Sequence, residues 1–168
     1  MELRRLPAEE DALRRFAEEL WLPYHRELAA TVEAHALADG VDLVAEEVAF
    51  RRERLESGAR AWVAIEDGGA LAGDAALAGF VTTSVDESPP VFDRPDRLVV
   101  GDIYVREPHR GTGLADRLID RAAERARASG CDELALDVDV DNERAIAFYE
   151  KLGFEPRRRR MVAAAENP

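Results

Sequence analysis

The sequence has little cysteine and little lysine, and acidic residues outnumber basic ones. Cys131 is the only cysteine, which excludes a disulfide within the chain. With 23 lysine and arginine against 35 aspartate and glutamate residues, the formal net charge is −12. Such a field repels polyanions, so nucleic-acid binding is disfavoured. The acidity has two interpretations: it solvates the surface, or part of it attracts a cationic substrate.

Long apolar runs are also lacking. Because no stretch of about 18 apolar residues occurs, no membrane-spanning helix and no membrane partner are expected. The first residues, MELRRLPAEEDALRRF, are charged throughout and lack the apolar core of a signal peptide. We therefore expect a cytoplasmic protein. Its acidic, alanine-rich composition, with Lys151 as the only lysine, fits a halophile-like acidic proteome or a GC-rich genome.

The chain length and its hydrophobic content predict the domain organisation. The 168 residues, 46% of them hydrophobic, suffice for one well-packed domain and are short for two. We expect a single domain over 1–168, with a helical N-terminal part at 1–60 and a core at 61–162 in which strands and helices alternate.

The N-terminal part shows helical spacing of its apolar residues and carries no chemical motif. A short strand is expected at 2–6, before a helix that starts near Pro7. The expected helix boundaries are an interruption at Pro23, the end of a second piece near Ala38, and a third helix from an Asp42 cap to Ser57-Gly58.

The remaining residues alternate between strand-forming runs and helical spacing, which indicates a mixed α/β sheet with helices packed against it. A turn is expected at Asp67–Gly69 and a loop at 86–97. The other expected elements are strands at 61–66, 76–85 and 98–105, a helix from 114 to Ser129-Gly130, a strand at 133–140, a helix from an Asn142 cap to Gly153, and a last strand from Phe154 that includes Met161 and Val162.

The stretch LVVGDIYVREPHRGTGLA, at 98–115, carries the first chemical signal. A buried strand runs into a glycine-containing turn, and a helix follows directly. The first turn of a helix offers unpaired backbone N–H groups and the positive end of the helix dipole, which together favour an anion. Arg110 adds a fixed positive charge beside this turn. The stretch is therefore suited to hold a phosphate or a pyrophosphate.

A second motif, NERAIAFYEKLGF at 142–154, follows about 30 residues later. Together the two motifs resemble those of the GNAT superfamily of acyl-CoA-dependent N-acetyltransferases. Arg110, Gly113 and Ala115 match the Arg/Gln-x-x-Gly-x-Gly/Ala signature of that superfamily. The second signature is matched by Asn142, Ala145, Phe148, Tyr149, Gly153 and Phe154.

The resemblance implies a mixed, mostly antiparallel sheet with a splayed pair of strands and flanking helices. It also implies that acetyl-CoA is the cosubstrate and that the 61–162 core binds it. Backbone groups at Ile103 and Val105 would pair with the pantetheine amides. The implied diphosphate loop and the cofactor-contacting asparagine comprise Arg110, Gly111, Thr112, Gly113, Leu114, Ala115 and Asn142.

Transfer of an acetyl group to an amine needs an acid and a base. The resemblance assigns Tyr149 as the general acid that protonates the leaving thiolate. Asp102 is an aspartate within an apolar strand, where it is unexpected. It either binds a substrate ammonium or relays its proton, or it is a buried structural residue. No metal is expected, because His25 and His35 lack ligand spacing.

These features predict an N-acetyltransferase that moves an acetyl group directly to a primary amine. The acceptor is a small molecule, such as a polyamine or an amino acid, or a peptide amine. The alternative is a non-catalytic acyl-CoA-binding or sensing module with the same fold. A homodimer is expected only because the resemblance to the GNAT superfamily suggests one.

Overall fold

The computed structural model describes residues 1–66, 71 and 73–166, so the turn expected at Asp67–Gly69 lies outside the described residues. The chain divides into two compact units, Met1–Asp137 and Val138–Pro168, and each is described by itself. The first unit contains the whole sheet.

Five strands form this sheet in the order β1-β2-β3-β4-β5. The first four pair antiparallel, and β5 pairs parallel with β4. This mixed, mostly antiparallel sheet confirms the predicted fold class. Its strands are β1 (Glu2–Arg5), β2 (Arg60–Ile65), β3 (Leu77–Asp86), β4 (Arg97–Val105) and β5 (Glu133–Leu136).

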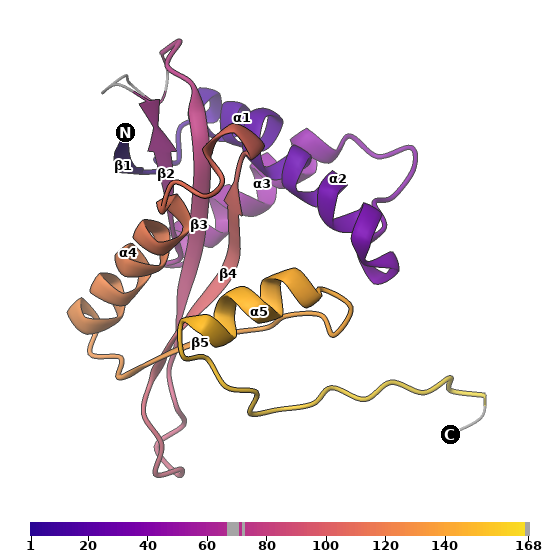
Figure 1. Cartoon of the computed structure of the whole chain (residues 1–168), viewed down its shortest axis with the longest axis vertical. Helices are drawn as coiled ribbons and strands as arrows, with labels where there is room; N and C mark the ends of the chain where they lie inside the picture. The colour runs from indigo at the N-terminus through magenta and orange to yellow at the C-terminus, as the bar shows by residue number, and fades with distance from the viewer. Residues whose placement is uncertain (67–70, 72, 167–168) are drawn as a thin grey trace. The chain divides into compact units, whose positions relative to one another are not determined.

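Helices cover both faces of the sheet (Figure 1). Helix α4 (Leu114–Ala128) packs on one face against β3 and β4, and α1, α2 and α3 lie on the other. The core on that second face joins helix and strand residues, among them Leu13, Phe16, Phe80 and Tyr104. The N-terminal helical segments are α1 (Glu10–Phe16), η1 (Ala17–Trp21), α2 (Leu22–Thr31), η2 (Glu33–His35) and α3 (Leu43–Glu56).

The prediction that Pro23 interrupts the first helix is wrong. Residues from Glu10 to Thr31 stay helical, and a π-helical turn, η1, stands just before the proline. In this turn the Leu22 N–H donates to the carbonyl of Ala17, five residues back. Pro23 then occupies the first turn of α2, where its missing N–H costs least. The second piece also ends at Thr31, earlier than expected.

A β-bulge lies in the middle of β4. The register with β3 shifts between Val81 and Thr83, so Gly101 and Asp102 together oppose Thr82. The Thr82 hydroxyl accepts a hydrogen bond from the Asp102 N–H at 2.8 Å, in place of a ladder bond. A Cβ at position 101 would lie 2.8 Å from that same hydroxyl, so glycine is required there.

The bulge changes which face of the sheet the β4 side chains occupy. Before it, Val100 pairs with Thr83, whose hydroxyl is bound by Arg125 of α4. After it, Tyr104 pairs with Phe80 in the core beneath α1. Asp102 is likewise directed to the α3 side, where it meets Arg51. The bulge therefore places a carboxylate among the N-terminal helices.

Strands β4 and β5 separate after a short ladder. Their pairing runs from Arg97–Glu133 to Val100–Leu136, and β5 then ends. The strand expected at 133–140 is thus half as long as predicted. Along the described residues, the edge of β4 beyond Val100 is left without a neighbouring strand.

The second unit contains α5 (Glu143–Lys151). The Asn142 side chain accepts from the Ala145 N–H, so the predicted helix cap is confirmed. The last strand expected from Phe154 is not formed, and Met161 and Val162 are about nine-tenths exposed. The four consecutive like charges at 157–160 disfavour a paired strand in this segment.

Candidate functional site

The loop between β4 and α4 has the geometry of an anion cradle. After a short 3₁₀ turn, η4 (Glu107–His109), Gly111 and Gly113 both adopt positive φ, of 75° and 81°. A Cβ built at either glycine meets nothing within 4 Å, so space lies open over the loop. Gly113 caps α4, whose first-turn N–H groups lack helical partners. These features fit the diphosphate predicted here.

The other predicted loop residues differ in their side-chain contacts and burial. The Thr112 hydroxyl donates to the His109 carbonyl at 2.6 Å, which ties the loop to η4. Leu114 is buried at the start of α4 and anchors the helix to the sheet. Ala115 is half-buried in the first helical turn and adds little bulk there.

Arg110 lies at this loop with its charge already paired. Its guanidinium donates to the carbonyl of Val105 at 2.9 Å and to a carboxylate oxygen of Glu27 at 2.5 Å. The Tyr104 hydroxyl donates to the other Glu27 oxygen at 2.7 Å. Burial is the larger cause and this hydrogen bond the second cause of a rise in the pKa of Tyr104 to about 12, so the Tyr104 hydroxyl stays protonated. Glu27 of α2 thus links the loop to the N-terminal helices.

The open edge of β4 presents alternate backbone groups. The N–H groups of Asp102 and Arg106 both face β3, where they donate to Thr82 and Ala78. Because successive peptide groups of a strand point to opposite edges, those of Ile103 and Val105 face the edge that β5 leaves. At this edge the Val105 carbonyl accepts the hydrogen bond from Arg110. The predicted pairing of Ile103 and Val105 with the pantetheine amides requires backbone groups that face this edge.

A cavity of about 360 Å³ lies beside the bulge. It is formed by the helices on the α3 side of the sheet together with β4. Asp102 is the one predicted site residue that lines it. The full lining comprises Trp21, His25, Glu46, Glu47, Phe50, Arg51 and Asp102.

Three of these residues form a charged network. Arg51 donates to Glu47 at 2.7 Å and approaches a carboxylate oxygen of Asp102 to 3.8 Å. The side chains of Glu47 and Arg51 are only 3% and 7% exposed. Burial raises the pKa of the Glu47 carboxyl, and the adjacent Arg51 opposes that rise. The guanidinium also lies over the ring of Phe16, 5.4 Å from its centroid.

His25 contributes an imidazole to the same cavity. Its ring packs against Trp21 and Tyr24, with centroid distances of 4.5 and 4.7 Å. Burial lowers the pKa of His25, and the nearby Asp102 charge opposes that shift. Burial therefore favours the neutral form of this imidazole.

The remaining two predicted residues belong to the second unit. Asn142 caps α5 through the Ala145 N–H at 3.2 Å. Tyr149 lies within α5, and its ring contacts those of Phe148 and Phe154 at centroid distances of 5.4 and 5.6 Å. These contacts fix the orientation of the phenol within its own unit.

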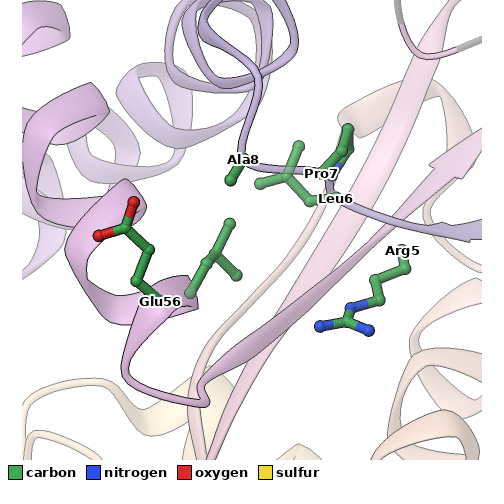
Figure 2. Close-up of a pocket in the computed structure, with 6 residues that line it drawn as sticks. Arg5, Leu6, Pro7, Ala8 and Glu56 are labelled. Atoms are coloured by element: carbon green, nitrogen blue, oxygen red, sulfur yellow. The ribbon is translucent and has the colours of Figure 1, made fainter.

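A second hollow, of about 320 Å³, lies where the chain passes from β1 to α1. Figure 2 shows Leu6, Pro7 and Ala8 between the charged ends of Arg5 and Glu56. None of the predicted site residues lines it. We therefore place the candidate site at the cavity beside Asp102.

Sequence reasoning did not identify Glu47, Arg51 or His25 as site residues. Glu47 and Arg51 are spaced i, i+4 on one helix, which by itself indicates an ordinary surface ion pair. Only the packing of α3 against α1 and β2 brings this pair near Asp102 of β4. The spacing of Trp21 and His25 on consecutive helical turns was the one local signal available.

Within residues 1–66, 71 and 73–166, no group of three or more histidine, cysteine, aspartate or glutamate residues is arranged to hold a metal ion. Over the same residues, no helix is both long enough and apolar enough to span a bilayer.

The chain was compared with known proteins. The N-alpha-acetyltransferase MAK3 of Arabidopsis thaliana is 40% identical over 58 residues, which make up 34% of this chain and 30% of that protein. Glucosamine 6-phosphate N-acetyltransferase of Trypanosoma brucei brucei is 39% identical over 74 residues, or 43% of this chain and 48% of that protein. The chain thus spans about a third to a half of the length of these relatives.

A solved structure and a family model match far more of the chain. The aminoglycoside N-acetyltransferase AAC(6')-Iy, solved in complex with CoA, shares the fold with a TM-score of 0.66 at 19% identity. The match covers 97% of this chain and 93% of that one. The model of the acetyltransferase (GNAT) family matches residues 13–154. Because that match takes in most of the sequence, the chain belongs to the acetyltransferase (GNAT) family.

Proposed function

We propose that this protein is an N-acetyltransferase that moves an acetyl group from acetyl-CoA directly to a primary amine. The observation that carries the proposal is the position of β4. Its open edge at Ile103 and Val105 leads to the glycine loop, and its bulge directs Asp102 into the cavity. A donor on that edge and an acceptor in the cavity would therefore meet at one strand.

The donor side rests on the loop and the free edge. Backbone groups at Ile103 and Val105 would bind the pantetheine, and the loop from Arg110 to Ala115 would bind the diphosphate. The CoA complex of the solved structure with the same fold supports this assignment. Arg110 would exchange its Glu27 partner for a phosphate oxygen.

The acceptor side is an anionic cavity. Its lining carries three carboxylates, from Glu46, Glu47 and Asp102, against the single guanidinium of Arg51. This balance favours a cationic ammonium, which Asp102 would bind. The acceptor class is a primary amine of a small molecule or of a peptide. The relatives that act on N-alpha amines and on glucosamine 6-phosphate support an amine acceptor.

The proposed chemistry is aminolysis of a thioester. Most of the rate gain would come from holding the amine against the acetyl group in one orientation. Tyr149 would donate a proton to the departing sulfur, a role that rests on its match to the family motif. The homodimer and the cytoplasmic location stay predictions.

The test is a transfer assay with acetyl-CoA and a panel of amines: amino acids, polyamines, aminoglycosides and short peptides. The proposal predicts release of the CoA thiol together with an acetylated amine detected by mass spectrometry. Thiol release without an acetylated amine would indicate hydrolysis and contradict the proposal. Binding of acetyl-CoA with no turnover on any amine would favour the non-catalytic acyl-CoA-binding module instead.

A further inference from the structure

We propose that His25 takes the proton from the acceptor ammonium, an inference that rests on the proposed acetyl transfer. An amine attacks a thioester only through its lone pair, and an ammonium has none. The cavity must therefore contain a base. His25 lines that cavity together with Asp102.

The imidazole is held in place by its neighbours. The rings of Trp21 and Tyr24 pack against it at 4.5 and 4.7 Å, one on the preceding turn of helix and one adjacent in sequence. Within the described part of the chain, no hydrogen bond to either ring nitrogen is found. An oriented ring whose nitrogens are not engaged can accept a proton from a bound ligand.

The other bases of the cavity are already engaged. Glu47 and Asp102 are both ion-paired with Arg51, at 2.7 and 3.8 Å. Glu46 lies at the exposed rim of the cavity on α3. An imidazole is also a stronger base than a carboxylate, since its ordinary pKa is near 6.5 rather than near 4. Among the described residues of the lining, His25 is thus the base that is neither ion-paired with Arg51 nor at the exposed rim.

The charges around His25 suit this role. Asp102 faces His25 from β4, and His35 faces it from η2. Three charged residues of α3 also lie on this cavity: Glu46, Glu47 and Arg51. Burial, with Arg51 and His35, lowers the pKa of His25 and keeps the resting imidazole neutral. Asp102 opposes that shift and would stabilise the imidazolium once it has formed. The resting form is therefore the one that accepts a proton.

His25 removes one proton from R–NH₃⁺, and the amine nitrogen attacks the thioester carbonyl carbon. The C–N bond forms and the C–S bond breaks, and the electron pair leaves with the sulfur. A second proton from the nitrogen ends on the CoA thiol. The imidazolium finally returns its own proton to water, so no other reactant is needed.

The experiment compares His25→Ala and His25→Gln with the wild type at pH 8. The matched control is His35→Ala, which removes the other histidine of this region. Two acceptors of similar size are used: ethylamine, which is mostly protonated at that pH, and trifluoroethylamine, which is mostly neutral. With ethylamine, kcat/KM of both His25 variants should fall by roughly 10²–10⁴. With trifluoroethylamine the fall should be much smaller, because the amine needs no base.

Two further readouts separate catalysis from structure. Added imidazole should restore part of the His25→Ala activity toward ethylamine, and the Kd for acetyl-CoA should be unchanged. An equal loss on both amines without rescue would show a structural residue and overturn the inference. Full activity of His25→Ala beside an active wild type would also overturn it while the proposed function stands. If the wild type itself acetylates no amine, the proposed function fails as well.

Discussion

Replacement of Arg51 by methionine removes the only cation from the network of Glu47, Arg51 and Asp102 and so tests what that network contributes to stability. Methionine keeps much of the apolar stem that packs near Phe16 but removes the guanidinium. The Glu47 carboxylate, whose side chain is 3% exposed, is then left in the interior without its partner. Breaking a buried ion pair from one side typically costs about 3–5 kcal/mol of folding free energy. For a chain of this length, that corresponds to a fall in Tm of about 10 °C.

The stability that Arg51→Met loses should also depend on pH, and the pKa shift of Glu47 determines the direction of that dependence. Burial raises the pKa of this carboxyl, so its protonated form is favoured in the folded state. For an acid with a raised pKa, stability is fully present below the unfolded pKa, near 4.5, and is lost as pH rises through the folded pKa. Without Arg51 that pKa rises further. The difference in the free energy of unfolding between wild type and Arg51→Met should therefore increase from pH 5.5 to pH 8.

Thermal and urea unfolding of three variants completes this test. Glu47→Gln combined with Arg51→Met removes the buried charge and should recover most of the lost stability. The control is Arg14→Met, which breaks the exposed Arg14–Glu10 pair and should leave the Tm close to the wild-type value. The reasoning is refuted if Arg51→Met costs no more than this control, or if the double variant is no more stable than Arg51→Met.

Two other substitutions probe the proposed general acid, Tyr149, and the bulge. Tyr149→Phe should lower kcat more than it weakens acetyl-CoA binding; unchanged kcat with collapsed binding, measured by steady-state kinetics and calorimetry, would make Tyr149 structural. Thr82→Val removes the acceptor for the Asp102 N–H and should cost about 1–2 kcal/mol in urea unfolding, with a raised KM for the amine. Thr82→Ser keeps the acceptor and should behave like the wild type; equal effects of valine and serine would contradict the assigned hydrogen bond.

Much of the first unit follows from local sequence signals. The Asp42 cap, the strand before the glycine loop and the helix after Gly113 lie where spacing and capping chemistry placed them. These features depend on neighbouring residues alone, so one sequence suffices to read them. The same holds for Asn142, whose side chain caps α5.

Other features depend on contacts between distant segments, and the sequence did not show them. At the bulge in β4, the Asp102 N–H donates to the hydroxyl of Thr82, some twenty residues earlier. The role of Arg51 follows only when α3 packs beside that bulge. The helix through Pro23 continues because a π turn precedes it, which no periodicity argument predicts. The strand expected from Phe154 to include Met161 and Val162 would have needed a partner strand, which the sequence did not specify.

We propose that acetyl-CoA binds at the open edge of β4 and the loop before α4, and calorimetric titration can decide this. Gly113→Glu places a bulky negative side chain at φ 81° over the loop, whereas Gly130→Glu makes the same change at φ 71° beyond the other end of α4. We predict one-to-one binding by the wild type and by Gly130→Glu, and its loss in Gly113→Glu. The ligand should stabilise the wild type by about 2.7 kcal/mol at a hundredfold excess over Kd. No binding by folded wild-type protein, or equal binding by both glycine variants, would contradict the account.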